Sequence, residues 1–377
     1  MRFNIASFRW VFFLATLCSL LDLKARAQAP VVVTTNTTIR VMASNLTSGS
    51  NQRYETPGLN ILKALKPDIV AMQEFNVSNS FGINTAAAIR SMIDSTFGTN
   101  FVYFRETGYS IPNGIISRYP FKSSGSWTDS DTGVNDRGFA WAEIEIPGTN
   151  HLYIVSVHLK ASSGTTNETR RTAEANELTS QIATNFPTNA WIIVAGDMNL
   201  YSETEGAIIT FKTYLSDDPV PADQNGDPDT NASRGARYDR VLPSFSFNSN
   251  RVATIIRSNT FTNGLVFDSR VYNPLSEVAP VVSTDSGSVN MQHMGVVKDF
   301  RVNYTVTNFV TVPSPTLVLN STNILRWQGL SNVTYSVQAS TNLPTFSTVG
   351  TAVSTTTNLS FTNQTGGEQQ FFRVVYP

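Results

Sequence analysis

The sequence predicts an α/β domain followed by a small all-β domain. Up to about residue 300, segments typical of strands, such as Trp191–Val194, alternate with segments of helical periodicity. After Phe300 charged residues become scarce, and Thr, Ser, Asn and Val dominate. Short strand patterns separated by turn-rich spacers then follow, which is typical of a β-sandwich. The chain of 377 residues is also longer than one ordinary domain.

The first 27 residues are predicted to be a secretory signal peptide. A positively charged start precedes an apolar stretch from Trp10 to Leu21, and Ala25-Arg26-Ala27 is a cleavage site of the A-x-A type. The apolar stretch is too short to span a membrane, and nothing after it is apolar enough. We therefore expect a secreted or periplasmic protein whose mature chain begins at Gln28. Cys18, the single cysteine, lies inside the signal, so disulfide and thiol chemistry are not expected.

The α/β domain is expected to begin with a loose lead-in over residues 28 to 38, which are rich in Thr, Val and Asn. Gly58–Leu65 is predicted to be a helix that stops before Pro67. A longer helix is predicted from Glu168 to about Asn185, with one polar and one apolar face. Its outward residues are predicted to be Arg170, Arg171, Glu174 and Glu177, and its inward residues Ala173, Leu178 and Ile182.

Polar residues stand at or near the ends of the predicted strands. The apolar strand Trp191–Val194 leads into Ala195-Gly196-Asp197-Met198-Asn199, which places a carboxylate and an amide two residues apart on one side of the backbone. These are ligand types that Mg²⁺ accepts, although an Asp and an Asn after a strand more often form a plain turn. Other strand ends in the chain carry Asn45, Glu74, Asn113, His158 and Asp239.

Five segments, in their order along the chain, resemble the motifs of the endonuclease/exonuclease/phosphatase superfamily. They are Gln73-Glu74, Asn113-Gly114 with Ser117-Arg118-Tyr119-Pro120, Val157-His158-Leu159-Lys160, Gly196-Asp197-Met198-Asn199 and Tyr238-Asp239-Arg240. The resemblance covers residues 38 to 301 and implies a four-layer α/β sandwich of two mixed sheets with helices outside. It also implies a metal-dependent phosphoric ester hydrolase. One departure is that Gln292, not Asp, precedes His293 in the last motif, which leaves the number of metal ions open.

The resemblance implies a role for each matched residue. Glu74 and Asn45 would hold Mg²⁺, for which Mn²⁺ could substitute. Asp197 would orient the attacking water or accept its proton, and Asn199 would hold a phosphate oxygen or the shell of the metal.

The histidines would provide acid–base chemistry. His293, its ring oriented by Asp239, would act as a base or as a donor to phosphate. His158 would contact phosphate or protonate the leaving oxygen, with Glu106 as the nearest candidate for its carboxylate partner. His151 matches no position of the family and is predicted to be structural.

Further residues are predicted to contact phosphate or substrate, on fewer matches to the family motifs than the residues above. Arg118 lies in the Ser-Arg-Tyr-Pro turn, where a structural role is favoured. The other members are Glu106, Asn113, Gln292, Arg105 and Arg137.

The polar insertion Asp217–Arg237 carries acidic and amide residues in alternation, as a calcium loop does. The bidentate Glu that would close such a loop is missing, so a solvated loop is favoured. Because the insertion precedes Tyr238-Asp239-Arg240, we expect it to shape access to the site. The alternating residues are Asp223, Asn225, Asp227 and Asp229.

The predicted domains are a signal peptide (1–27), a phosphoesterase domain (28–303), a linker (304–315) and a β-sandwich module (316–377). Strands in the module are predicted at 316–319, 324–327, 334–340, 359–361 and 371–375. The module resembles fibronectin-like modules of secreted bacterial proteins. Its aromatic residues are expected in the core; a sugar platform is the alternative, so binding to a surface or polysaccharide stays open.

The combined prediction is a secreted, Mg²⁺-dependent phosphodiesterase, with a nuclease acting on extracellular nucleic acid as the leading hypothesis. The net charge of −1 neither supports nor excludes a polyanionic substrate, because a bound cation supplies local positive charge. A phospholipid or small phosphate-ester hydrolase of the sphingomyelinase type is one alternative, although the sequence indicates no amphipathic hairpin for membrane docking. A catalytically inactive binding or adhesion protein, with Gln292 as the lesion, is the other.

Overall fold

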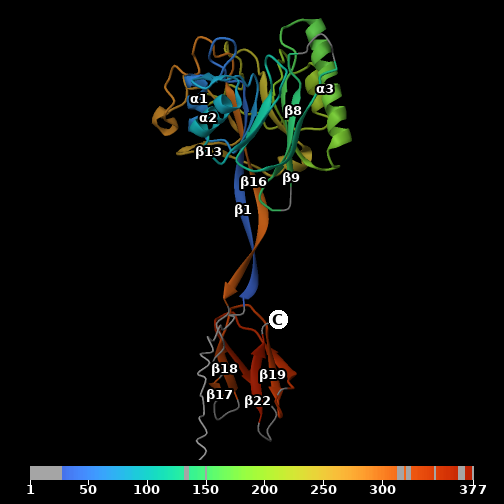
Figure 1. Ribbon diagram of the computed structural model, residues 1–377, viewed down its shortest axis with the longest axis vertical. Helices are drawn as coiled ribbons and strands as arrows, with labels where there is room; N and C mark the ends of the chain where they lie inside the picture. The colour runs from blue at the N-terminus through green and yellow to red at the C-terminus, as the bar shows by residue number, and fades with distance from the viewer. Residues whose placement is uncertain are drawn as a thin grey trace, which may run out of the picture. The chain divides into compact units, whose positions relative to one another are not determined.

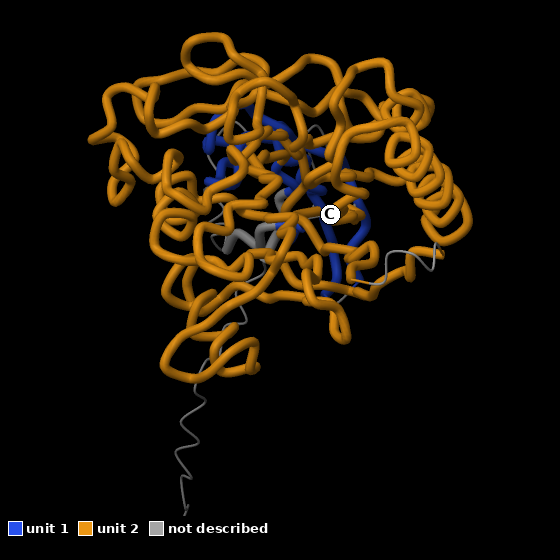
Figure 2. The backbone as a smooth tube through the Cα atoms, turned by 90° about the horizontal axis from the view of Figure 1, so that it is seen from above, with its two compact units in different colours: residues 1–33, 307–377 blue, residues 34–306 orange. Residues whose placement is uncertain are grey.

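The structure is a computed structural model that describes residues 28–130, 136–148, 151–311, 318–319, 324–343, 345–363 and 370–375. The predicted signal peptide lies outside the described residues. The chain divides into two compact units: Thr34–Val306, and a second unit that contains the described residues from Thr307 onward and those before Thr34 (Figure 2).

Two mixed β-sheets form the centre of the larger unit (Figure 1). The first has the strand order β12-β16-β1-β2-β6-β5, with β15 paired to β16. Its strands are β1 (Gln28–Ser44), β2 (Ile69–Met72), β5 (Val102–Arg105), β6 (Gly114–Ser117), β12 (Arg251–Val252), β15 (Leu265–Phe267) and β16 (Gly295–Thr311). The second has the order β11-β10-β9-β8-β7. Its strands are β7 (Phe121–Trp127), β8 (Phe139–Glu145), β9 (His151–His158), β10 (Trp191–Asp197) and β11 (Asp239–Pro243).

Helices cover the outer face of each sheet, so the unit has four layers, as the resemblance implied. A buried apolar cluster with members such as Val41, Ile154 and Ile193 lies between the two sheets. A second cluster packs the first sheet against α1 (Thr56–Leu65), α2 (Ala86–Thr96) and the 3-10 helix η1 (Leu275–Val278). A third packs the second sheet against α3 (Thr165–Asn185) and α4 (Gly206–Phe211). Burial on both faces explains why strands such as β2 are wholly apolar.

Short elements lie in the connections. They are the hairpins β3 (Ser78–Asn79) with β4 (Gly82–Ile83) and β13 (Thr254–Ile256) with β14 (Asn259–Phe261), and the helix α5 (Phe245–Asn248). None of the helices in the described part of the chain combines the length and the apolar character needed to span a membrane.

Both predicted helices are confirmed, but the predicted faces of the longer one are partly wrong. In α3, Arg171 and Glu174 are buried, whereas Ala173 is exposed. The reason is that polar groups of the chain, not an apolar surface, face this part of the helix. Arg171 donates to the carbonyls of Lys160 and Ser162, and Glu174 accepts from the Lys160 amide.

The ends of the larger unit are more regular than the sequence predicts. Residues 28 to 38, expected as a loose lead-in, belong to strand β1. Strand β16 runs to Thr311, into the segment expected as a linker. The domain boundaries themselves stay a prediction.

The C-terminal unit is an all-β module of two three-stranded sheets, β17-β18-β21 and β20-β19-β22. All five predicted strands are present, and each ends within one residue of its predicted end, whereas β20 was not predicted. Residues 316 and 317, predicted as the start of the first strand, lie outside the described residues. Trp327 and Tyr335 are buried in its core with their rings 6.2 Å apart, which confirms the core assignment of these aromatics. The strands are β17 (Val318–Leu319), β18 (Ile324–Gln328), β19 (Tyr335–Ser340), β20 (Ser347–Ala352), β21 (Asn358–Thr362) and β22 (Phe371–Val375).

Candidate active site

Asp197, at the end of β10, is the centre of a buried polar cluster. The register of the second sheet places Asp197 beside His158 of β9 on one side and Asp239 of β11 on the other. Its Oδ2 accepts a hydrogen bond from the Asn45 amide at 3.1 Å and lies 3.3 Å from the Nε2 of His158. The Nε2 of His293 lies 3.4 Å from the same oxygen. Four residues predicted from separate motifs therefore meet at one carboxylate oxygen.

His293 lies between two carboxylates. Its Nδ1 is 2.9 Å from Asp239 Oδ2, and its Nε2 faces Asp197. Burial favours the neutral ring, but the charges of Asp239 and Asp197 outweigh it and raise the pKa of His293 to about 10. The ring is therefore an imidazolium at neutral pH, a form that donates from both nitrogens.

His158 has the opposite electrostatic environment. Burial, followed by the positive charges of Arg137 and His293, holds the pKa of His158 well below its usual value. Burial also raises the pKa of Asp197 to about 6, helped by the charge of Asp239. Two histidines with widely different pKa values can take different roles in one reaction. The neutral His158 is suited to accept a proton or donate one hydrogen bond, and the charged His293 to stabilise an anion.

Glu74 and Asn45 follow the strands β2 and β1 of the first sheet. Glu74 is buried in the left-handed conformation, with φ of 50°, and accepts hydrogen bonds from Thr47 at 2.7 Å and Gln52 at 3.0 Å. The Oδ1 of Asn45 is buried without a hydrogen-bond partner among the described residues. Thr47 and Gln52 were not predicted; their signal was their place in the loop directly after Asn45.

The donor set around Asp197 fits a divalent cation. Asp197, Asp239 and His293 each offer an atom within 4.8 Å of the others. The charge of Glu74 also acts on His293, so Glu74 belongs to the same cluster. Because His293 is an imidazolium held by two carboxylates, the free Asn45 oxygen and the Glu74 carboxylate are the better ligands. Three carboxylates and one imidazolium leave this buried site negative, which favours a bound cation.

Polar contacts between the two sheets fix the relative position of these groups. The Gln73 amide donates to the Ser156 hydroxyl at 2.8 Å, which in turn donates to the Met72 carbonyl. At Gly196, with φ of 142°, a Cβ would lie 2.1 Å from the Val157 carbonyl oxygen and 2.6 Å from the Gln73 amide nitrogen. Only glycine allows the backbone to come this close to Val157 and Gln73. This contact holds the end of β10, with Asp197, next to the end of β2, with Glu74.

Asn199 lies at the site but is largely engaged by the protein. It has a left-handed φ of 49°, its backbone N–H donates to Asp197 Oδ1 at 2.9 Å, and its side-chain amide donates to the Leu159 carbonyl at 3.0 Å. It therefore holds the turn after β10 against the turn after β9.

Glu106 does not pair with His158, contrary to the expectation. Its carboxylate accepts from the backbone N–H of Asn113 at 2.7 Å, from Gly138 and from the Ser126 hydroxyl, so both oxygens are used. The Nδ1 of His158 is buried with no hydrogen-bond partner among the described residues. Glu106 instead supports the segments that carry Asn113 and Arg137. The Asn113 amide donates to the Gly138 carbonyl, and its Oδ1 is buried without a described partner.

The arginines named from the sequence separate into two groups. Arg105 donates to the Phe75 carbonyl and Asn76, and Arg118 pairs with Asp68, so both are structural. Arg137 is buried, and its charge acts on His158. Two of its nitrogens pair with Asp136, whereas Nη1 is buried with no partner in the described part of the chain. Arg137 is therefore the arginine with a free donor at the site.

Of the two remaining residues considered in the sequence, Gln292 lies at the edge of the cluster and His151 lies away from it. Gln292 is exposed between the buried Met291 and His293. His151 stands at the opposite end of β9 from His158 and contacts Glu143, which agrees with a structural role.

The acidic insertion is held by an arginine. Arg234 donates to Asp223 at 2.7 Å and lies 2.9 Å from Asp227, which fills the position that the calcium-loop pattern would offer to an ion. The end of the insertion supports the site. The Thr230 hydroxyl accepts from the Asp239 N–H, and its carbonyl accepts from the Met294 N–H. The insertion thus holds Asp239 and the His293 segment together.

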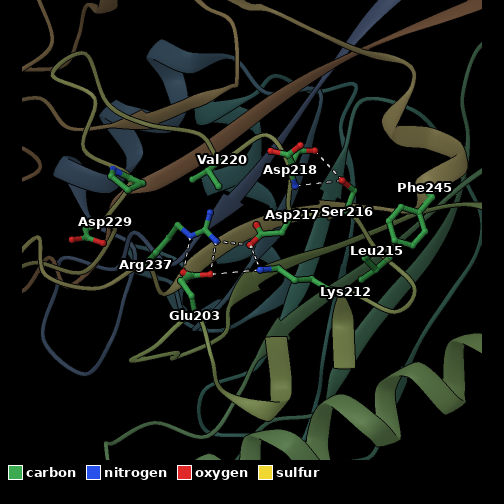
Figure 3. Close-up of a pocket in the computed structure, with 11 residues that line it drawn as sticks. Glu203, Lys212, Leu215, Ser216, Asp217, Asp218, Val220, Asp229, Arg237 and Phe245 are labelled. Atoms are coloured by element: carbon green, nitrogen blue, oxygen red, sulfur yellow. Dashed lines mark hydrogen bonds and ion pairs between the residues drawn. The ribbon is translucent and has the colours of Figure 1, made fainter. Parts of the chain in front are cut away.

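A cavity of about 630 Å³ lies beside the insertion but contains none of the residues of the Asp197 cluster. Figure 3 shows Arg237 and Lys212 directed at the carboxylates of Glu203 and Asp217 in its wall. Because these charges pair with one another, we place the chemistry at the Asp197 cluster and not in this cavity.

A sequence model of the Endonuclease/Exonuclease/phosphatase family matches residues 59–259, more than half of the chain. No curated protein sequence matches the chain. Among solved structures, an endonuclease/exonuclease/phosphatase from Beutenbergia cavernae is 13% identical with a TM-score of 0.49, over 90% of this chain and 92% of that one. An AP endonuclease from Archaeoglobus fulgidus is 14% identical with a TM-score of 0.45, over 70% and 99%. Beta toxin from Staphylococcus aureus is 12% identical with a TM-score of 0.45, over 69% and 99%.

Proposed function

Because the chain belongs to the endonuclease/exonuclease/phosphatase family, whose members are metal-dependent phosphoric ester hydrolases, we propose that it is a Mg²⁺-dependent phosphodiesterase that cleaves nucleic acid. The observation that carries the proposal is the convergence of Asn45, His158 and His293 on one carboxylate oxygen of Asp197. Phosphodiester hydrolysis needs an oriented water, a proton acceptor and positive charge near the phosphate, and this cluster supplies groups for each.

Glu74 and the free oxygen of Asn45 would hold the cation. Both are hard oxygen donors, and the described residues offer no cysteine ligand beside them, which favours Mg²⁺ or Mn²⁺ over zinc. When bound, the cation supplies Lewis-acid polarisation of the phosphate and stabilises the leaving oxygen.

The residues around the cation perform the remaining steps. Asp197, with its pKa raised to about 6, orients the attacking water and accepts its proton as the oxygen bonds to phosphorus and the ester bond breaks. The charged His293 donates to a non-bridging phosphate oxygen, where negative charge grows. The neutral His158 keeps its proton and donates a hydrogen bond from its Nε2–H to Asp197 or to the phosphate. This division refines the expectation for His293, because an imidazolium cannot act as a base.

Arg137 would bind the phosphate. Its Nη1 has no partner among the described residues, although the side chain is buried and its charge acts on His158. Asp136 already fixes the guanidinium, so the side chain of Arg137 does not have to be ordered when phosphate binds. The hydrogen bond from Nη1 to a phosphate oxygen would be charge-assisted and therefore strong.

Secretion is part of the proposal. It rests on the signal pattern over residues 1–27 and would place the substrate outside the cytoplasm. Mass determination of the N-terminus of the exported protein tests it, with Gln28 expected as the first residue.

The experiment that tests the function is a panel of phosphoesters assayed with Mg²⁺, Mn²⁺ and Ca²⁺. Release of acid-soluble nucleotides from DNA or RNA, abolished by chelation and restored by Mg²⁺ or Mn²⁺, is expected. Full activity in excess chelator would rule out the metal dependence. Absence of hydrolysis on every ester with every metal would favour a binding or adhesion protein.

A phospholipid substrate is a second candidate, which one observation favours. The hairpin β3–β4, directly after the Glu74 segment, exposes Phe81 by 58% and Ile83 by 57%. No such hairpin was predicted from the sequence, because its strands have only two residues each. Exposed apolar side chains at a hairpin tip can enter a lipid surface. Phosphocholine release from sphingomyelin vesicles, lost in Phe81→Ser, would support this candidate over a nuclease.

A further inference from the structure

An aromatic row leads from the buried cluster to the surface. The Tyr238 ring lies 6.0 Å from the His293 ring, and the Tyr201 ring lies 5.2 Å from the Tyr238 ring. His293 is buried, Tyr238 is half-buried and Tyr201 is 43% exposed. The two tyrosine rings are inclined by 59°, so they form a corner with apolar faces beside the reacting groups.

The buried face of the Tyr201 ring packs against Arg171. The Arg171 guanidinium lies 5.5 Å from the centre of the Tyr201 ring. Arg171 is fully buried, so it covers the inner face of the ring and leaves the outer face exposed. Its Nη2 has no hydrogen-bond acceptor among the described residues, which fits a contact with the ring. The backbone N–H of Tyr201 donates to Glu205, and Glu205 accepts from Arg171.

Tyr238 is held from two sides. Its ring lies next to the Tyr201 ring on one side and the His293 ring on the other. Burial, followed by the neighbouring Tyr201, raises the pKa of its phenol, whereas Asn231 lowers it. Asn231 itself bridges to His293 through the backbone. Both rings are therefore fixed before any substrate arrives, which lowers the entropy cost of stacking on them.

We propose that Tyr201 and Tyr238 form a subsite for a flat aromatic group of the substrate, a nucleobase next to the cleaved phosphodiester. This inference rests on the proposed function and makes its substrate class specific. A base has a π-face of the size of a tyrosine ring, and stacking tolerates every base sequence. A simple alkyl phosphate has no such face. A choline headgroup has no π-face either, but its quaternary ammonium makes cation–π contacts with tyrosine rings, so phosphocholine release from sphingomyelin vesicles that Tyr201→Leu abolishes would overturn the assignment to a nucleobase.

The test compares two substrates with the same phosphodiester backbone. One is a short single-stranded oligodeoxynucleotide, and the other replaces every nucleotide with a base-free tetrahydrofuran residue. Wild type is expected to show a KM on the order of tenfold lower for the substrate with bases. Tyr201→Leu keeps apolar bulk without the ring, and should raise that KM about tenfold while kcat changes less than about twofold. On the base-free substrate the variant should behave as wild type.

Two control variants separate the subsite from a structural effect. Tyr201→Phe keeps the ring face and should retain a KM near that of wild type. Tyr214→Leu removes a tyrosine that is 46% exposed but lines another surface, and should leave both substrates unaffected. Thermal unfolding of each variant checks the fold.

The subsite and the proposed function can fail separately. A Tyr201→Leu variant that raises KM equally on both substrates, lowers kcat instead, or has no effect overturns the subsite while the nuclease proposal stands. If wild type cleaves neither substrate and also neither duplex DNA nor RNA, the nuclease proposal fails. Quenching of a 2-aminopurine trinucleotide on binding then decides the subsite: quenching by wild type that Tyr201→Leu loses supports it, and equal or absent quenching overturns it.

Discussion

At the scale of single residues, the site is organised by its charges. Asp239 and Asp197 hold His293 as an imidazolium, whereas burial and Arg137 hold His158 neutral. The two rings therefore differ in protonation at neutral pH although both face Asp197. Titratable groups whose environments separate their pKa values mark distinct roles in proton transfer.

The first prediction concerns the histidines. His158→Ala and His293→Ala should each lower kcat on the order of 10²–10⁴-fold, the usual contribution of a positioned acid–base group. Asp239→Asn should resemble His293→Ala, because it removes the carboxylate that orients and charges the ring. His151→Ala, on the far end of the same strand as His158, is the control and should cost little. Steady-state kinetics measure all four, and equal small losses at all three histidines would contradict the site.

The second prediction concerns Gln292. Its side chain is neutral and exposed next to His293, so it brings no charge to the cation site. Gln292→Asp should tighten Mg²⁺ binding several-fold and leave the fold intact, because one carboxylate is added near the cation. Glu74→Gln is the opposite change, because it removes a charged ligand of the cation. It should weaken Mg²⁺ binding by about tenfold or more. Calorimetric titration of Mg²⁺ measures both.

Two results would change this interpretation. If Gln292→Asp leaves the Mg²⁺ affinity and the rate unchanged, Gln292 lies outside the cation site and the match of the last motif is wrong. If wild type hydrolyses nothing and Gln292→Asp hydrolyses phosphoesters, the binding-protein alternative gains support.

At the scale of elements, α3 does more than cover the second sheet. Its buried Arg171 and Glu174 bind the backbone after His158, and Arg171 also supports Tyr201. Burial, with the neighbouring charge of Asp129, raises the pKa of Glu174 to about 8. Arg170, which pairs with Asp129, only partly offsets this. Glu174 is therefore protonated in the folded protein at neutral pH.

The third prediction follows from that protonation. The folded-state pKa of Glu174 lies above its unfolded value, so ionisation opposes folding, and the stability that the protonated group provides is lost as pH rises from about 5 to about 8. Glu174→Gln keeps the acceptor for the Lys160 amide and cannot ionise. Its Tm should exceed that of wild type by an amount that grows over this window, to on the order of 5 °C.

Thermal unfolding at pH 5, 6.5 and 8.5 measures the third prediction. Glu168→Gln, on the first turn of the same helix, is the matched control. A difference in Tm between Glu174→Gln and wild type that stays constant or shrinks with rising pH would show that Glu174 is not the titrating group.

At the scale of the whole molecule, each compact unit has its own core. The clusters of the larger unit contain no residue beyond Val302, and the C-terminal module packs around Trp327, Tyr335 and Val337. All residues assigned to the site lie in the larger unit. A unit with its own core and complete sheets can fold alone.

The fourth prediction is that the larger unit is sufficient. Residues 28–311, which keep all of β1 and β16, should be soluble, unfold in one transition and retain kcat/KM within about twofold of the mature chain. Circular dichroism and the nuclease assay measure this. An insoluble fragment, or one that folds without activity, would contradict the two-domain organisation that the sequence predicts.

The sequence by itself indicated which strand ends carry polar residues, and it determined the class of fold. Strand patterns ending in Asn45, Glu74, His158 and Asp197 are local, and the strand period places polar ends on defined sides of the backbone. The composition change after Phe300 and the helical periods of α1 and α3 are local signals as well. The family resemblance added the four-layer order, which local patterns do not contain.

Tertiary structure alone decided the partners and the charges. The Asn45–Asp197 contact joins residues 152 positions apart, and no local pattern encodes such a distance. For the same reason the sequence missed that Arg234 fills the acidic loop, that Glu106 serves Asn113 instead of His158, and that Arg171 and Glu174 are buried. The pKa values of both histidines depend on burial and on charges from other strands, which exist only once the two sheets are packed.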